Sequence, residues 1–246
     1  MNTTAPASPT VVLVHGAFAD SSSWNGVIAE LRRRGYPVVA VANPLRGLRE
    51  DAAYLRSVLD AQSGPVVVAG HSYGGSVMSE AADGAGGVVA LVYVASFNLE
   101  AGESTAELAA KFPGGELGPA LAPVPFPLPG GGSGSDLYIR QDGFHAVFAA
   151  DVDPEVAALM AATQRPIAAS ALQDTATRAA WKSVPSWTMI TTQDLAIPAA
   201  SMRFMAKRAG SATVEIDASH AVTVSRPHAV AGLIDEAARA TAGRAG

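Results

Sequence analysis

The sequence contains no cysteine, and its charged residues are few. Without cysteine the chain has no disulfide, no thiolate nucleophile and no cysteine-ligated zinc or iron–sulfur site. Asp, Glu, Lys and Arg make up 16% of the residues, and a formal net charge of −5 lacks the basic surface that phosphate binding needs. Arg32 to Arg34 form the one basic run, at the end of an expected helix where cations face solvent. We therefore expect no nucleic-acid partner.

Long apolar runs are missing as well. The run from Val88 to Ala95 has the length of a strand and falls short of the roughly 18 residues that a membrane-spanning helix needs. Residues 1–10 are polar and lack the basic start and apolar stretch of a secretory signal. We expect a short disordered lead over residues 1–10, no membrane partner and a cytoplasmic protein.

The sequence does contain enough apolar material for one core, because 49% of its 246 residues are hydrophobic. Six short runs are rich in β-branched residues and continuous rather than alternating, which is typical of strands that are covered on both faces of a parallel sheet. These runs are Val11–Val14, Val38–Val41, Val66–Ala69, Val88–Val94, Trp187–Thr191 and Thr213–Ile216.

Apolar residues at helical spacing separate these runs, as in Leu48–Leu59, Met202–Ala209 and Val230–Ala237. The alternation of strands and helices predicts an α/β fold with a doubly wound, mainly parallel sheet. Ligands of such a sheet lie beyond the carboxyl ends of its strands.

The alternation breaks over residues 98–180. Residues 113–134 are rich in proline and glycine, and we expect them to form neither a regular helix nor a central strand. Asp153 and Pro154 precede a helical pattern as its N-cap and first-turn proline. We expect residues 98–180 to form a small, partly helical cap on a core made of residues 1–97 and 181–246.

A G-x-S-x-G motif lies where the third expected strand turns into a helix. Side chains two residues before and two residues after Ser72 would collide with the crossing backbone, and these positions are Gly70 and Gly74. The start of the helix directs free N–H groups toward the anionic intermediate of acyl transfer. The sequence lacks the glycine motifs of nucleotide-binding loops. Ser72 is therefore predicted to be a nucleophile.

Around these residues the sequence resembles the α/β-hydrolase superfamily, in particular the compact esterases that include plant methyl-ester esterases and hydroxynitrile lyases. The resemblance implies an α/β-hydrolase fold. Only ten residues precede the first strand, which leaves no room for the antiparallel hairpin of larger members, so we expect about six parallel strands. The resembling segments are His15-Gly16-Ala17-Phe18, the turn around Ser72, Thr192-Gln193-Asp194 and Ala218-Ser219-His220.

His220 is predicted to be the general base. It follows the last expected strand, and the superfamily order along the chain is serine, acid, histidine. We interpret His15 and His71 as structural neighbours that hydrogen-bond loop backbone, and His228 as a solvent residue at the start of a helix. His145, in the cap, is either a surface residue or a residue that contacts a polar group of the substrate.

The acid that orients His220 is predicted to be Asp194, which follows the fifth expected strand and precedes the base. An ordinary turn aspartate is the alternative interpretation. Asp217 is nearer to His220 in sequence but ends a strand, and Glu100 and Glu103 are weaker alternatives after the previous strand.

An oxyanion needs two backbone N–H donors. The residue after the nucleophile, Tyr73, supplies one, and the resemblance implies Ala17 as the other, with Phe18 close enough to be confused with it. Aromatic residues form the candidate walls of the substrate site, although each is equally consistent with simple core packing. The candidate substrate-binding residues are Phe18, Trp24, Phe97, Phe144, His145 and Trp181, with Tyr73, Phe126 and Phe148 as further candidates for the walls.

The leading hypothesis is a serine carboxylesterase that hydrolyses small to medium esters or lactones through an acyl-enzyme on Ser72, without a metal or cofactor. A hydroxynitrile lyase and a perhydrolase are alternatives on the same scaffold. Lyases of the resembling group carry threonine and lysine where this chain has Gly16 and Ala221, which disfavours the lyase; perhydrolysis stays open. A non-catalytic small-ligand receptor is disfavoured because binding requires no strained serine.

Overall fold

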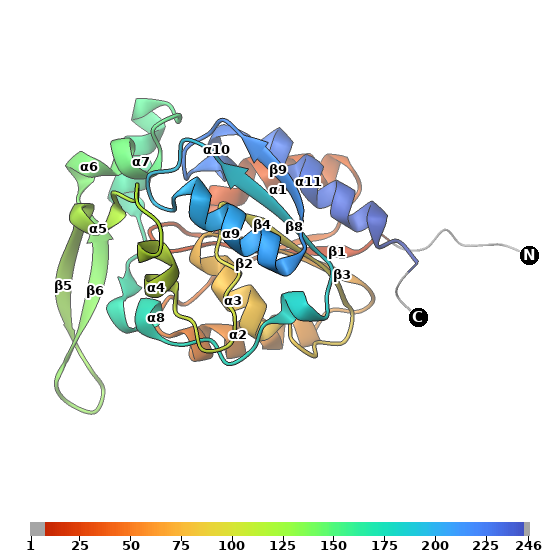
Figure 1. Cartoon of the computed structure of the whole chain (residues 1–246), viewed down its shortest axis with the longest axis horizontal. Helices are drawn as coiled ribbons and strands as arrows, with labels where there is room; N and C mark the ends of the chain where they lie inside the picture. The colour runs from red at the N-terminus through yellow and green to blue at the C-terminus, as the bar shows by residue number, and fades with distance from the viewer. Residues whose placement is uncertain (1–7, 244–246) are drawn as a thin grey trace, which may run out of the picture.

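The computed structural model describes residues 8–243. Within these residues, the core is a six-stranded parallel sheet with the order β2-β1-β3-β4-β8-β9 (Figure 1). Each strand lies on one of the predicted runs, which confirms the predicted fold class. The strands are β1 (Thr10–Val14), β2 (Val38–Val41), β3 (Val66–His71), β4 (Val88–Val94), β8 (Ser186–Thr191) and β9 (Ala212–Ile216).

The predicted lead over residues 1–10 lies mostly outside the described residues, which begin at Ser8. Thr10 already pairs with Val66 in the sheet, so the first strand includes one residue that was assigned to the lead.

Helices cover both faces of this sheet (Figure 1). The helices α1 (Asn25–Arg33) and α11 (Pro227–Ala240) pack together on one face, and α2 (Leu48–Asp60) and α3 (Tyr73–Ala81) pack together on the other, where α9 (Ala199–Ala209) also lies. All residues of β3 are buried, because helices lie on both of its sides. This burial explains why the central strands are continuously apolar in sequence.

The strand order creates a crevice at one edge of the sheet. From β1 the chain moves outward to β2 and then returns across β1 to β3, so the loops after β1 and β3 diverge from each other. In an open parallel sheet, ligands bind at such a reversal, beyond the carboxyl ends of the strands. Ala17 follows β1 and Ser72 follows β3, so the fold brings these two residues to the reversal.

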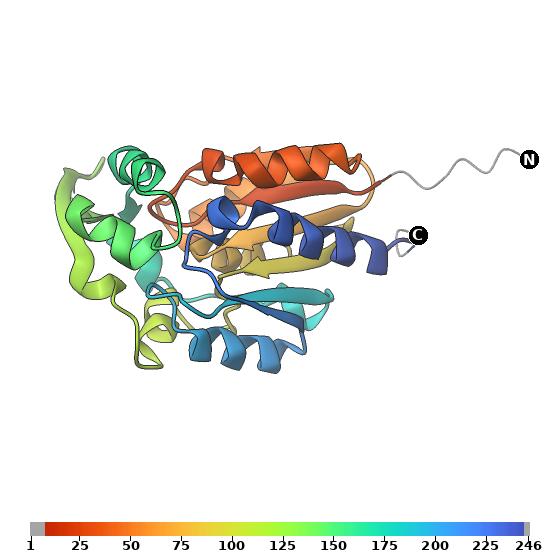
Figure 2. The same ribbon diagram turned by 90° about the horizontal axis from the view of Figure 1, so that it is seen from above.

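Between β4 and β8 the chain leaves the core sheet and forms short helices and an antiparallel sheet, β5-β6-β7, at one end of the molecule (Figure 2). The start of β1 and the end of α11 lie at the opposite end (Figure 2). The elements in this segment are α4 (Thr105–Ala110), α5 (Leu117–Ala120), β5 (Leu121–Pro127), β6 (Ser133–Ile139), α6 (Gln141–Phe148), α7 (Pro154–Thr163), β7 (Ile167–Ala168), α8 (Ala169–Gln173) and the 3₁₀ helix η2 (Ala180–Lys182).

The prediction that residues 113–134 form neither a regular helix nor a central strand holds except at the start of β6. They contain the single turn α5, the strand β5 and the beginning of β6, the middle strand of the small sheet. Pro123, Pro125 and Pro127 are two residues apart in β5, so their missing N–H groups all face the same edge, while the residues between them supply the donors to β6. Prolines on the open edge also prevent another strand from pairing there.

The sequence correctly predicts the start of α7. Asp153 Oδ1 accepts hydrogen bonds from the backbone N–H groups of Glu155 (2.9 Å) and Val156 (3.3 Å), and Pro154 occupies the first turn. The arginines at 32–34 are exposed, as predicted. Over the described residues, no helix combines the length and the apolar character that crossing a membrane requires.

Candidate active site

Ser72 occupies the turn between β3 and α3 in a strained conformation, with φ 55° and ψ −127°. The two flanking glycines make this turn possible. A Cβ on Gly70 would lie 2.8 Å from the backbone of Gly74, and a Cβ on Gly74 would lie 2.3 Å from the carbonyl oxygen of Val14. The helix therefore packs directly on the neighbouring strands, and the serine lies at its N-terminus. Ser72 is 8% exposed.

The loops after β8 and β9 bring Asp194 and His220 into contact. His220 Nδ1 lies 2.8 Å from Asp194 Oδ2, and the two side chains are 1% and 0% exposed. The two residues are 26 positions apart in the sequence, and the order of serine, acid and histidine along the chain predicted that they would pair. Asp217, the alternative nearer in sequence, instead accepts a hydrogen bond from the Thr192 hydroxyl at the surface.

The carboxylate of Asp194 has a full set of donors. Besides His220, Oδ2 receives the Thr191 hydroxyl at 2.8 Å, and Oδ1 receives the backbone N–H groups of Ala196 and Ile197, both at 2.8 Å. Hydrogen bonds from several donors fix the orientation of this buried carboxylate. Asp194 Oδ2 accepts the hydrogen bond from His220 Nδ1–H, which leaves the lone pair of Nε2 available as a base.

The residue before Ser72 links the serine turn to the His220 loop. His71 Nε2 donates to the backbone carbonyl of His220 at 2.8 Å, and the two rings lie 4.7 Å apart. Among residues 8–243, no hydrogen bond joins Ser72 Oγ to His220. In unliganded enzymes, catalytic hydrogen bonds of this kind are often long and form fully only with substrate bound.

His71 is kept neutral. Burial, reinforced by the nearby His220, lowers the pKa of the His71 imidazole to about 3. Its Nε2 must carry the proton that is donated to the His220 carbonyl, and Nδ1 has no partner within the described residues. The interpretation of His71 as a structural neighbour is confirmed: the ring supports the His220 backbone and does not itself titrate at neutral pH.

The backbone N–H groups of Ala17 and Tyr73, the two predicted oxyanion donors, make no hydrogen bond within the described part of the chain. The Phe18 N–H, the rival candidate, donates to the Arg165 carbonyl at 3.0 Å. Of these three candidates, Ala17 and Tyr73 are therefore the ones available to an oxyanion.

The side chain of Tyr73 points away from this position. Its hydroxyl donates to Asp51 Oδ2 at 2.9 Å, and the residue is 1% exposed. Burial raises the pKa of the Tyr73 phenol, and burial likewise raises the pKa of the Asp51 carboxyl. The ring of Tyr73 therefore anchors α3 to the start of α2 and forms no wall of a substrate site.

Phe148, at the end of α6, is the aromatic residue most closely associated with His220. The ring centroids are 4.8 Å apart in an edge-to-face arrangement, and the Phe148 carbonyl accepts the N–H of Ala221 at 2.9 Å. Sequence reasoning named Phe148 only as one of several further wall candidates. The backbone contact carries no signature in the sequence, because any residue supplies a carbonyl.

Four of the candidate substrate-binding aromatics are buried. Phe18 packs edge-to-face on Phe148, Phe144 stacks on the same ring, Trp24 packs on His71, and the Phe97 N–H faces the Ser72 carbonyl at 3.4 Å. All four are at most 4% exposed. These aromatics therefore surround the candidate site, and Trp24 and Phe144, with no exposed surface, are core residues in this conformation.

The remaining two candidates make other contacts. His145 Nε2 donates to the Val152 carbonyl at 3.0 Å, so this nitrogen is occupied within the cap. The Trp181 indole N–H donates to the Leu99 carbonyl at 2.8 Å, and Arg208 lies over its ring at 5.5 Å. Both residues thus make structural contacts, and their contact with substrate stays a prediction.

A cavity of about 210 Å³ opens next to the Ala17 loop, between the 3₁₀ helix η1 (Ser21–Trp24) and α7. Its lining is mainly apolar, with hydroxyl groups on the η1 side. The residues that line it are Phe18, Ala19, Asp20, Ser22, Ser23, Val156, Leu159, Met160, Thr163, Gln164 and Val224, the last from the short helix α10 (Val222–Ser225).

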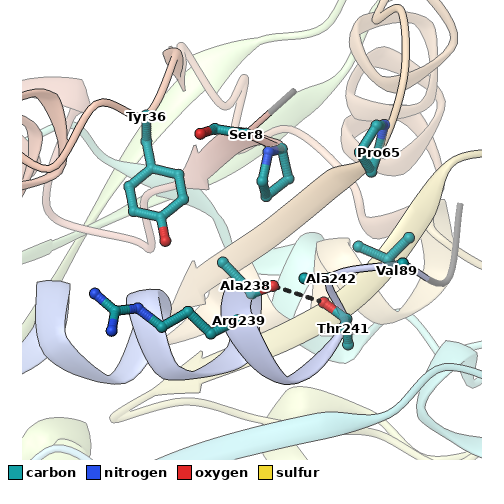
Figure 3. A pocket seen from close by; sticks show the side chains of 10 residues that line it. Ser8, Tyr36, Pro65, Val89, Ala238, Arg239, Thr241 and Ala242 are labelled. Carbon is teal, nitrogen blue, oxygen red and sulfur yellow. Dashed lines mark hydrogen bonds between the residues drawn. The ribbon is translucent and has the colours of Figure 1, made fainter. Parts of the chain in front are cut away.

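A larger cavity, about 390 Å³, lies at the other end of the sheet, between Tyr36, Pro65 and the last turn of α11 (Figure 3). Figure 3 shows the Thr241 hydroxyl hydrogen-bonded to Ala238 in the last turn of α11. Ser72, Asp194 and His220 are not among the residues that line this cavity. Strand amino ends border this cavity, so it is separate from Ser72. Within the described residues, no group of histidine and carboxylate side chains is arranged to hold a metal ion.

Comparison with known proteins assigns the chain to a family. Residues 11–233 match the family described as the alpha/beta hydrolase family. The chain belongs to this family. The hydrolase is 29% identical to the alpha/beta hydrolase nvfD of Aspergillus novofumigatus, with 94% of this chain and 96% of the relative covered. It is 33% identical to the probable hydrolase R7 of a Phoma species over 39% of this chain and 46% of that protein.

Solved structures share the hydrolase fold. Polyneuridine aldehyde esterase has a TM-score of 0.80 at 19% identity, with 93% of this chain and 98% of that chain covered. The methylesterase MES16 from Arabidopsis has a TM-score of 0.78 at 17% identity, with 94% and 99% covered. A pyrethroid hydrolase from Sphingobium faniae JZ-2 has a TM-score of 0.76 at 21% identity, with 95% and 98% covered. The family and the named relatives support an enzyme with hydrolytic activity.

Proposed function

We propose that this protein is a serine carboxylesterase. The observation that carries the proposal is the buried 2.8 Å contact between His220 and Asp194, held through His71 against the strained turn of Ser72. A nucleophile on a strained turn and a base oriented by a saturated carboxylate are the parts that acyl transfer requires. The esterases among the solved relatives agree with this reaction class.

The reaction follows from the positions of these groups. Ser72 Oγ attacks the ester carbonyl carbon while His220 Nε2 takes the hydroxyl proton, and Asp194 stabilises the resulting imidazolium. The N–H groups of Ala17 and Tyr73 receive the negative charge on the carbonyl oxygen. The protonated His220 then gives its proton to the leaving alkoxide, and an acyl-enzyme remains on Ser72. Water, deprotonated by His220, attacks this acyl group; the bond to Ser72 Oγ then breaks, the imidazolium returns the proton to Oγ, and the acid leaves.

The cavity of about 210 Å³ supports an uncharged substrate of small to medium size. It adjoins Phe18, next to the proposed oxyanion donor, and its far wall is the apolar side of α7 formed by Leu159 and Met160. The walls are mainly apolar, and their one carboxylate, Asp20, accepts the Ser22 N–H, so they suit the alkyl or acyl part of an ester better than a charged group.

The test is the variant Ser72→Ala with p-nitrophenyl acetate as substrate. We expect turnover to fall by roughly 10⁴ to 10⁶, because the acyl-enzyme cannot form. Ser57→Ala, which removes a hydroxyl on the exposed side of α2, is the control and retains wild-type turnover. Retention of most activity in Ser72→Ala would end the proposal.

A non-catalytic small-ligand receptor is the second candidate, favoured by the absence of a Ser72–His220 hydrogen bond in the described residues. A fluorophosphonate probe separates the two. The esterase reacts covalently at Ser72, and a receptor with an unactivated serine leaves the probe unreacted.

A further inference from the structure

The loop that carries Ala17 begins with a histidine whose proton position is determined by its neighbours. His15 is 0% exposed and follows β1 directly. The backbone N–H of Asn43 points at His15 Nε2 at 3.0 Å. Because a backbone N–H only donates, Nε2 must be the acceptor, and the ring proton of the neutral imidazole therefore resides on Nδ1.

The Nδ1–H of His15 donates to the carbonyl oxygen of Gly16 at 2.9 Å. This carbonyl belongs to the same planar peptide group as the N–H of Ala17. Among residues 8–243 no peptide bond is cis, so the two point in opposite directions. The imidazole that holds the Gly16 oxygen therefore also fixes the direction of the Ala17 N–H.

The Gly16–Ala17 peptide group lies against Ser72. A Cβ on Gly16 would lie 2.6 Å from Ser72 Cβ and 3.3 Å from Ser72 Oγ. Two further hydrogen bonds hold the loop on either side: the Asn43 side-chain amide donates to the His15 carbonyl at 3.0 Å, and the Phe18 N–H donates to the Arg165 carbonyl at 3.0 Å. The N–H of Ala17, between these two supports, makes no hydrogen bond within the described residues.

We propose that His15 is a positioning residue, which acts through the Gly16–Ala17 peptide to hold the Ala17 N–H where the oxyanion of the reaction forms. The inference rests on the proposed esterase function. His15 touches no substrate, and Asn43 sets its tautomer. Burial lowers the pKa of the His15 imidazole, which keeps the ring neutral and Nε2 able to accept.

Three variants at this position separate positioning from packing. In His15→Asn, the amide nitrogen occupies the place of Nδ1 and still donates to the Gly16 carbonyl. In His15→Gln, the terminal oxygen reaches the place of Nε2 and still accepts from the Asn43 N–H, but the Gly16 carbonyl loses its donor. His15→Leu loses both hydrogen bonds.

We expect kcat for p-nitrophenyl acetate to fall roughly 10²- to 10³-fold in His15→Gln and His15→Leu, with KM changed by less than about threefold. The donor acts on charge that develops only in the transition state, so the loss appears in kcat. His15→Asn is expected to retain kcat within about tenfold of wild type. The rate of fluorophosphonate labelling at Ser72 should rank the variants in the same order.

Two kinetic outcomes overturn the inference. Equal losses in His15→Asn and His15→Gln would show that the ring only fills space, and wild-type kcat in His15→Gln would show that its Nδ1 donor is dispensable. The ¹⁵N chemical shifts of the His15 ring test the geometry without activity: a proton on Nε2 instead of Nδ1 would also overturn it. If the wild-type protein neither hydrolyses esters nor labels at Ser72, the proposed function fails, and the chemical shifts still decide the tautomer.

Discussion

At the scale of single residues, hydrogen bonds give each polar group of the site a single role. Asp194 Oδ1 accepts hydrogen bonds from two backbone N–H groups, and Oδ2 accepts them from Thr191 and His220. The bonds to Oδ1 fix the loop, and the bonds to Oδ2 fix the imidazole. Each oxygen of the carboxylate therefore has its own role.

This separation predicts the behaviour of Asp194→Asn. The amide oxygen can keep the bonds from Ala196 and Ile197, so the fold should be preserved and Tm should change by only a few degrees. The amide nitrogen cannot accept the His220 Nδ1 proton, which favours the wrong tautomer, and kcat for p-nitrophenyl acetate should fall about 10⁴-fold. Asp217→Asn, at the surface, is the control. Retention of more than a tenth of the activity in Asp194→Asn would contradict the assignment.

At the scale of elements, the approach of α3 to the sheet depends on glycine. A Cβ on Gly74 would lie 2.3 Å from the Val14 carbonyl oxygen, and β1 backbone cannot move away without disturbing the sheet. Gly74→Ala should lower the free energy of unfolding by about 1–3 kcal/mol or more. Gly232→Ala is the matched control: a Cβ there meets nothing within 4 Å in the middle of α11, so the variant should gain about 0.5–1 kcal/mol. Urea titration measures both, and equal effects would show that the close approach is not limiting.

The helix α7 forms one wall of the cavity beside Phe18, and this position predicts an effect on substrate size. Met160→Trp should fill the cavity and raise KM for p-nitrophenyl octanoate by roughly tenfold, with little change for the acetate. Ala162→Trp, at an exposed position on the same helix, is the control and should leave both KM values unchanged. An equal change for the two esters in Met160→Trp would show that long substrates bind elsewhere.

At the scale of the whole molecule, the cap, residues 98–180, is attached to both loops of the site. The Arg165 carbonyl holds the Phe18 N–H in the loop after β1, and the Phe148 carbonyl holds the Ala221 N–H in the loop after β9. Residues 98–180 therefore support both the loop of the proposed oxyanion donor Ala17 and the loop of the proposed base His220.

Burial of neutral histidines also gives the molecule a pH-dependent stability. Burial lowers the pKa of His71 in the folded state to about 3 from the ordinary histidine value of 6.5, so between these values the unfolded chain binds a proton that the folded chain does not. The stability that the neutral ring contributes is thus present above pH 6.5 and is lost as the pH falls toward 3, by up to about 1.4 kcal/mol per unit.

We therefore expect the free energy of unfolding to fall more steeply between pH 6.5 and pH 4 in the wild-type protein than in His71→Gln, which keeps a donor for the His220 carbonyl but does not titrate. Urea unfolding at several pH values measures the two slopes. His228→Gln, which removes a ring whose side chain is 77% exposed, is the control. Parallel curves for the wild type and His71→Gln would refute this linkage.

The sequence by itself determined the sheet, the serine turn and the candidate pair of Asp194 and His220. Buried parallel strands have to be apolar on both faces, a sharp strand-to-helix turn has to have glycine at fixed positions, and loops after parallel strands have to meet at one edge. Such constraints act on residue type and are visible in one dimension.

Only the tertiary structure decided the cap and the supports of the site. In the small sheet β6 pairs with β5 across a turn and with the more distant β7, and the prolines of β5 hid this edge strand from sequence reasoning. The groups that hold the loops of the candidate site, the carbonyls of Phe148 and Arg165 and the N–H of Asn43, belong to the backbone. Every residue carries such groups, so no pattern of side chains reveals which of them the fold uses.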